Sequence, residues 1–233
     1  MFKQGNAIRD YVFPLATANR VKGEMHFNNL LGSGFVIGSN SWALTCSHVT
    51  QANNLANDEI IVTMFVADDR WCGFEVTNIE NHPTEDVAIF KIQHEPLSSI
   101  FSLSDSWEGS SLNYKMFGYP DDMMFELDES GRSTGRPDLV YLQGYIRRRI
   151  NHDIPQLRGK AFFELSEVGG TGCSGNPVFK IIPNDPVWKI VGIYCGEKLN
   201  DRGASVSYAV RAEVFRNWIP EVLGKPIIKE SNA

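Results

Sequence analysis

The feature that most constrains the fold of this chain is a series of short apolar segments with no amphipathic helix between them. The segments are rich in β-branched and aromatic residues and are bounded by Gly, Asn, Asp or Pro, a pattern typical of strands that end in turns. They lie at residues 34–37, 42–45, 59–66, 74–79, 87–92, 112–118, 139–147, 161–165, 177–182, 188–194 and 206–210. This succession predicts an all-β barrel or sandwich rather than a parallel α/β sheet.

Two other segments organise the chain. Residues 93–111 are rich in Ser, Glu and Asp, and we expect them to link two halves of comparable size. A helix is expected near the end, perturbed in its last turn by Pro220. The apolar residues that predict it recur at the spacing of one helix face and are Val210, Val214, Phe215, Trp218 and Ile219.

Charge and cysteine content limit the partners and the compartment. The chain has 22 basic and 28 acidic residues among 233, a net charge of −6, which argues against nucleic acid as a partner. No apolar stretch approaches the roughly 18 to 20 residues of a membrane span, and the apolar segment near the N-terminus is too short for a signal peptide. Four cysteines without a CxxC pair predict reduced thiols and a cytoplasmic location.

The strongest chemical signal is the loop at residues 172–177 (GCSGNP), which precedes a predicted strand. Glycines permit backbone angles that let successive amides point at one spot and stabilise a developing oxyanion. Ser174 within this loop needs a base to become a nucleophile. Read alone, Ser174 also fits an ordinary serine in a loop.

A base and an acid are available in the first half. His48 follows the apolar strand at residues 42–45, and Asp86 precedes the apolar strand at residues 87–92. A carboxylate at the mouth of a buried strand is costly unless it is hydrogen-bonded. Taken singly, His48 also fits a core histidine and Asp86 a turn residue, so their occurrence together with Ser174 carries the argument.

Four motifs in this order resemble those of the trypsin-like (chymotrypsin-fold) serine peptidases: GSGFVI at 32–37, LTCSHV at 44–49, DVAI at 86–89 and GCSGNP at 172–177. The resemblance extends over nearly the whole chain. It implies two six-stranded antiparallel β-barrels with a C-terminal helix. Residues 1–100 would carry His48 and Asp86, and residues 101–233 would carry Ser174.

The resemblance also implies the roles of the residues. Ser174 would be the nucleophile, His48 the general base and Asp86 its buried acceptor, and the amides of Gly172 and Ser174 would form the oxyanion hole. The walls of the substrate pocket would be Val168, Gly169 and Gly170 on one side and Tyr194, Cys195 and Gly196 on the other. Val168 stands where trypsin-like members that cleave after basic residues have aspartate, so that preference is disfavoured.

Two departures refine the prediction. Secreted digestive members have an aspartate before the nucleophile, which pairs with a new N-terminus after activation. This chain has Cys173 there, and no activation sequence is seen near its start. The cysteine that would form a disulfide beside the catalytic histidine is replaced by Val49. Both features are similar to bacterial-type intracellular members made without a zymogen, and the oxyanion loop would then be ordered by a substrate, a partner or neighbouring packing.

Other chemistries fit less well. Cysteine nucleophiles of this fold directly precede the glycine, a position held here by Ser174 rather than Cys173. The last glycine of a nucleophile elbow is missing, and Cys72, His82 and His94 lack the spacing of a zinc site. We therefore predict a serine endopeptidase without metal or organic cofactor that acts on a protein or peptide substrate inside the cell. The alternative is a latent or non-catalytic module of the same fold that needs an activating protein partner.

Overall fold

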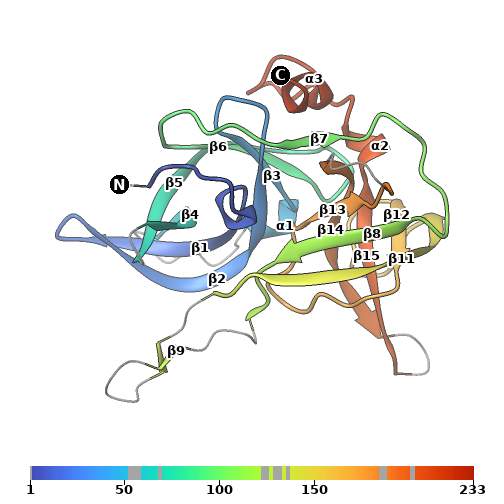
Figure 1. The fold of residues 1–233 in the computed structure, drawn as a ribbon, viewed down its shortest axis with the longest axis horizontal. Coiled ribbons are helices and arrows are strands. Elements are labelled where there is room, and N and C mark those ends of the chain that lie inside the picture. Colours follow the sequence, from blue (N-terminus) through green and yellow to red (C-terminus); the bar gives the residue numbers. More distant parts are fainter. Residues whose placement is uncertain are drawn as a thin grey trace.

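The computed structural model describes residues 2–51, 59–67, 70–121, 137–183, 188–199 and 203–233, and only the backbone of residues 126–127 and 133–134. Strands dominate the described chain (Figure 1). The helices are short: η1 (Ile8–Asp10), α1 (Ser47–Thr50), α2 (Ala212–Phe215) and α3 (Ile227–Ser231).

The first half forms a closed barrel in the strand order β1-β2-β3-β6-β5-β4. Every neighbouring pair is antiparallel. Its interior is filled by fully buried aromatic side chains, Phe13, Phe35, Phe65 and Phe90 among them. The six strands are β1 (Val12–Val21), β2 (Glu24–Ile37), β3 (Trp42–Thr45), β4 (Ile60–Ala67), β5 (Arg70–Asn81) and β6 (Ala88–Ile92).

The second half forms a sheet in the order β13-β8-β11-β12-β15-β14-β7. A further antiparallel pairing of β13 with β14 closes the first six strands into a ring, so the predicted pair of six-stranded barrels is confirmed. The strands are β7 (Phe101–Leu103), β8 (Asn113–Gly118), β11 (Val140–Asn151), β12 (Ala161–Leu165), β13 (Pro177–Lys180), β14 (Trp188–Leu199) and β15 (Ser205–Arg211). Two short strands, β9 (Glu126–Leu127) and β10 (Ser133–Thr134), pair with each other.

Strand β7 lies inside the segment at residues 93–111 that was expected to be a plain linker. It pairs in parallel with β14 from Phe101 to Leu103, so part of that segment belongs to the second sheet. The division into units at residue 100 stays a prediction.

The first strand, β1, was not among the predicted strands, and its apolar run contains Pro14. Proline donates no hydrogen bond, and within sheets it is found at edges, strand starts and bulges. Here the ladder between β1 and β4 begins at Leu15, one residue after the proline, so the missing donor breaks no pairing with β4.

The predicted C-terminal helix is wrong in its extent. Val210 belongs to strand β15, where it lies opposite Ile193, because the barrel ladder uses its backbone. Helix α2 is a single turn, and Ile219 is exposed. The second terminal helix, α3, was not predicted. It packs back against the first residues of the second half, where Leu103 N donates to Ser231 Oγ at 2.9 Å.

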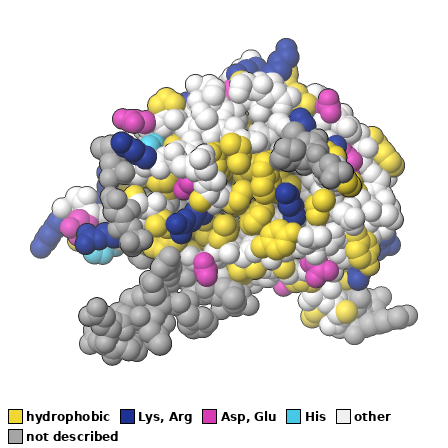
Figure 2. All heavy atoms as spheres, viewed as in Figure 1, with side chains coloured by type: hydrophobic (Ala, Val, Ile, Leu, Met, Phe, Trp, Pro, Cys, Tyr) yellow, Lys and Arg dark blue, Asp and Glu magenta, His cyan; other side chains and the backbone are white. Residues whose placement is uncertain are grey.

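Three further observations concern the surface, the cysteines and the helices. On the face shown in Figure 2, hydrophobic side chains form a band, while basic and acidic side chains are scattered around it. The four cysteines, all among the described residues, form no disulfide. None of the helices in the described part of the chain has both the length and the apolar character to cross a membrane.

Candidate active site

The two predicted residues of the first barrel lie in direct contact. His48 sits on helix α1, one turn that follows strand β3, and Asp86 lies two residues before strand β6. The imidazole Nδ1 is 2.7 Å from Asp86 Oδ2. The backbone amide of His48 and the hydroxyl of Ser47 both donate to Asp86 Oδ1, at 3.0 Å and 2.7 Å. The buried carboxylate therefore has three hydrogen-bond donors, which compensate for the cost of burying its charge.

These bonds set the charge of Asp86 and the tautomer of His48. Burial raises the pKa of Asp86, but hydrogen bonding and charge interaction with His48, and the bonds from Ser47 Oγ and the His48 amide, outweigh burial and hold the pKa below its usual value. An ionised carboxylate only accepts hydrogen bonds, so Nδ1 carries the proton. In the neutral ring the lone pair is then on Nε2. The His48 side chain is 48% exposed.

Ser174 lies on a loop that enters strand β13 and is braced by the first barrel. Ser33 of strand β2 donates from its backbone amide to the carbonyl oxygen of Ser174 at 2.8 Å and from its hydroxyl to the carbonyl oxygen of Gly172 at 2.9 Å. On the other side, Gly175 N donates to Tyr194 O at 2.8 Å. Contacts with both barrels thus hold the loop, and neighbouring packing is one of the three means that the sequence left open, beside a substrate and a partner. The side chain of Cys173 adds a bond of 2.9 Å from Sγ to Gly169 O.

Gly175 is required by this close approach, and its replacement is a sharp test of the bracing. A Cβ on Gly175 would lie 1.9 Å from Ser33 O, and its φ of +97° disfavours any other residue. We expect Gly175→Ala to lower the free energy of unfolding by about 2 to 4 kcal/mol, measured by urea denaturation. The matched control is Gly203→Ala, with φ +75° and no atom of the described residues within 4 Å of its Cβ. Equal losses in the two variants would contradict the bracing, since both share the backbone cost.

The backbone amides beside Ser174 are available for an incoming acceptor. Within the described ranges, neither Gly172 N nor Ser174 N donates to a backbone or side-chain acceptor. The φ of Gly172 is +90°, a conformation that glycine adopts freely. A Cβ there would lie 2.5 Å from Tyr119 O, so glycine is also needed for space.

The structure does not bond Ser174 to His48. Among the residues it describes, no hydrogen bond joins Ser174 Oγ to the imidazole ring. The hydroxyl and the ring are contributed by different barrels, and hydrogen bonds between catalytic groups often tighten only when a substrate binds.

The predicted walls of the substrate pocket are joined by a side chain. Gly169 N donates to the phenolic oxygen of Tyr194 at 3.1 Å, and a Cβ on Gly169 would lie 3.1 Å from Tyr194 Cζ. Tyr194 is fully buried, Cys195 is 3% exposed, and Val168, expected at the pocket floor, is 38% exposed. The phenol therefore fills the space between the segments of Gly169 and Tyr194, while Gly170 and Gly196 remain partly exposed.

A cavity of about 410 Å³ opens beside the imidazole of His48. It lies between helix α1, strand β14 and the segment that connects β11 to β12. Its lining consists of Ser47, His48, Gln51, Asp86, Gln156, Leu157, Arg158, Cys195, Gly196, Glu197 and Lys198. Of these, His48, Asp86, Cys195 and Gly196 were predicted as site residues. Ser47 and Arg158 are among those that were not: Ser47 stands in the motif at 44–49 without an assigned role, and an isolated arginine carries no motif signal.

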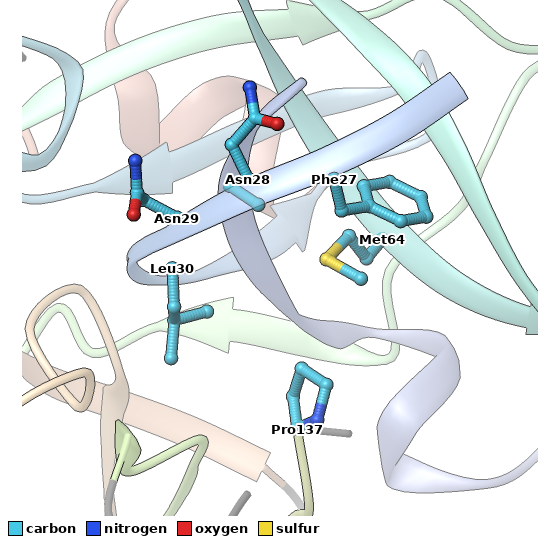
Figure 3. Close-up of a pocket in the computed structure, with 7 residues that line it drawn as sticks. Phe27, Asn28, Asn29, Leu30, Met64 and Pro137 are labelled. Carbon is cyan, nitrogen blue, oxygen red and sulfur yellow. The ribbon is translucent and has the colours of Figure 1, made fainter. Parts of the chain in front are cut away.

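A second cavity, of about 240 Å³, lies along strand β2 (Figure 3). The residues labelled in the close-up, which line it, are Phe27, Asn28, Asn29, Leu30, Met64 and Pro137. Leu30 also reaches the loop that carries Ser174, since its Cδ2 would lie 3.1 Å from a Cβ on Gly172. This cavity is therefore close to the loop of Gly172 and Ser174.

The arrangement is poorly suited to a metal ion. Cys46, His48 and Asp86 bring potential ligand atoms within 4.8 Å of one another. However, burial, followed by the charge of Asp86, raises the pKa of the Cys46 thiol well above its usual value, so it stays protonated, and metals bind the thiolate. Nδ1 of His48 is likewise engaged with Asp86.

Comparison with known proteins is consistent with this geometry. A family model described as the trypsin-like peptidase domain matches residues 32–193. No curated protein matches the chain in sequence. Among solved structures, the MamO protease domain from Magnetospirillum magneticum is similar over 86% of this chain and 92% of its own, with 16% identity and a TM-score of 0.60.

Two other solved structures share the fold. The Rv3671c protease of M. tuberculosis in its active form has 18% identity and a TM-score of 0.56, covering 96% of this chain and 81% of its own. The HtrA-type protease AlgW with a tripeptide has 17% identity and a TM-score of 0.60 over 88% of this chain, which spans 57% of the length of AlgW. Because the family model covers more than half of the sequence and the barrels have the matching architecture, the chain belongs to the trypsin-like peptidase family.

Proposed function

We propose that this protein is a serine endopeptidase that cleaves peptide bonds through Ser174, His48 and Asp86. The observation that carries the proposal is the contact of 2.7 Å between His48 Nδ1 and the ionised Asp86, which leaves the lone pair on Nε2. The amides of Gly172 and Ser174 support it, because they donate to no acceptor among the described residues and can stabilise a negative oxygen next to the proposed nucleophile.

The reaction follows from these groups. Ser174 Oγ attacks the carbonyl carbon of the scissile bond while its proton passes to His48 Nε2, and the carbonyl oxygen becomes an oxyanion held by the two amides. The imidazolium then gives that proton to the departing amine, leaving an acyl group on Ser174. Water then attacks the acyl carbon and loses a proton to Nε2. As the bond between the acyl carbon and Ser174 Oγ breaks, the imidazolium returns that proton to Oγ, and the carboxylic acid is released. Asp86 stabilises the imidazolium at each stage and does not itself take up the proton.

The substrate proposed is a protein inside the cell, and the proposed location is the cytoplasm. Three of the four thiols are buried and none is in a disulfide, as expected for a reducing compartment. The proposed chemistry uses only side chains and backbone amides of the chain.

Tyr194 leads to a prediction about specificity. Its phenol fills the space between the segments of Gly169 and Tyr194, so we expect cleavage after small side chains such as Ala or Ser and little cleavage after Phe or Arg. The difference should be at least about tenfold in kcat/KM, because a large side chain would have to displace a buried ring. A peptide library varied at the residue before the scissile bond measures it. Tyr194→Phe, which keeps the ring, should retain the preference. Efficient cleavage after large residues by the parent would contradict it.

The direct test of the proposed function uses the full chain. We expect a fluorophosphonate probe to label Ser174 and casein to be hydrolysed by the purified protein. Hydrolysis only after a cell lysate is added would favour the latent form of the enzyme. If the probe fails to label the protein both with and without the lysate, the non-catalytic module is favoured.

A further inference from the structure

An arginine of the second half reaches across to the residues that hold Asp86. Arg158 lies on the segment between strands β11 and β12 and donates from Nη2 to the backbone oxygens of His82 and Pro83, at 2.6 Å and 3.1 Å. Its Nη1 donates to Ser47 Oγ at 3.2 Å. The planar guanidinium fork can serve several acceptors at fixed angles in this way. One side chain thus connects the second barrel to the turn before Asp86 and to helix α1.

The contact with Ser47 fixes the direction of a proton. A serine hydroxyl has one proton and accepts through its lone pairs. Because Ser47 Oγ accepts from the Arg158 cation, its proton points to the remaining acceptor, Asp86 Oδ1, at 2.7 Å. Ser47 is fully buried, so water does not compete for that proton. The contacts then continue through Asp86 Oδ2 to Nδ1 of His48.

We infer that Arg158 is a positioning residue, which orients the imidazole of His48 through Ser47 and Asp86. This inference rests on the proposed peptidase function. Arg158 holds the Ser47 hydroxyl and the turn at residues 82–83 in place, and these hold the carboxylate against the imidazole. The residue that tunes the proposed base is thus supplied by the opposite barrel, the one that carries Ser174.

The geometry distinguishes this role from substrate binding. Arg158 lines the cavity beside His48, but both of its terminal nitrogens donate to groups of the protein. A substrate-binding role would appear mainly in KM, whereas a positioning role acts through the orientation of His48 and appears mainly in kcat.

The test compares Arg158→Met, which keeps the aliphatic stem but removes the donors, with Ser47→Ala and with the double variant. For Arg158→Met we expect kcat to fall about 10- to 100-fold with KM changed less than about threefold. Since both substitutions interrupt one path, the double variant should be no slower than the slower single variant within about threefold. In the unliganded protein, the low-field proton resonance of His48 Nδ1 should shift or broaden in each variant.

The matched control is Lys160→Met, which removes a cation from the same segment. Lys160 Nζ lies 3.7 Å from Asp153 Oδ2 in a pair whose side chains are at least 70% exposed, so kcat and the resonance should stay unchanged. An unchanged resonance in Arg158→Met, multiplicative losses in the double variant, or a change confined to KM would each overturn the inference. Because the resonance is read without substrate, it tests the inference even if the parent protein fails to hydrolyse peptides, a failure that would count against the proposed function instead.

Discussion

Replacing Ser174 with alanine is expected to abolish peptide hydrolysis, with a loss of about 10⁵-fold or more in kcat. The physical reason is that the alanine methyl group cannot form the acyl intermediate. Water must then attack the peptide bond directly, which is far slower. The folded state should hardly change, because the Ser174 hydroxyl makes no hydrogen bond within the described chain and the loop is held by its backbone. The measurements are kcat on a cleaved peptide, fluorophosphonate labelling and the melting temperature.

The neighbouring Cys173 supplies the control for Ser174→Ala. Its thiol is 1% exposed and donates to Gly169 O, so it is not presented to a substrate. Cys173→Ser keeps a donor at that position and should retain activity to within about tenfold. Residual activity of Ser174→Ala within about tenfold of the parent, or loss of labelling only in Cys173→Ser, would refute Ser174 as the nucleophile.

Replacing Asp86 with asparagine is expected to lower kcat by about 10⁴-fold without loss of the fold. Oδ1 of the amide can still accept from Ser47 Oγ and His48 N, which places its NH₂ group against Nδ1 of His48. That nitrogen must then accept, so the ring proton moves to Nε2 and no lone pair faces the serine side. Steady-state kinetics measure the loss, and ¹⁵N chemical shifts of His48 report the tautomer.

Asp105→Asn is the control for Asp86→Asn, because it removes an exposed carboxylate from the second half of the chain. It should leave both the kinetics and the tautomer unchanged. If Asp86→Asn lowered kcat while His48 kept its proton on Nδ1, the role of Asp86 in selecting the tautomer would be wrong.

Much of the fold could be predicted from local sequence patterns. Strand segments such as β3 and β12 combine β-branched or aromatic residues with turn residues at both ends, and the structure places strands there. The predictions of secondary structure failed where pairing between strands distant in sequence overrides the local sequence pattern. Strand β1 tolerates Pro14 because the pairing with β4 starts at Leu15, and Val210 joins the barrel ladder although its spacing suits a helix.

The candidate site shows the same division. The sequence pointed to His48, Asp86 and Ser174 through motifs that resemble a family, and the structure brings His48 and Asp86 into contact. The sequence did not indicate Arg158, because its contact with Ser47 joins residues 111 positions apart and has no local pattern. The contact of the Tyr194 ring with Gly169 likewise depends on the register of strands distant in sequence.

By itself, the sequence determined the all-β class and the identities of the chemical groups, because strand formation and side-chain chemistry are local properties of short segments. Only the tertiary structure decided how those groups work together. Ser33 braces the loop of Ser174, Ser47 and Arg158 hold Asp86, and Tyr194 closes the space beside Gly169. Each of these contacts joins elements far apart in the chain. Their formation depends on the closure of the barrels and on how the barrels pack together, which no short segment encodes.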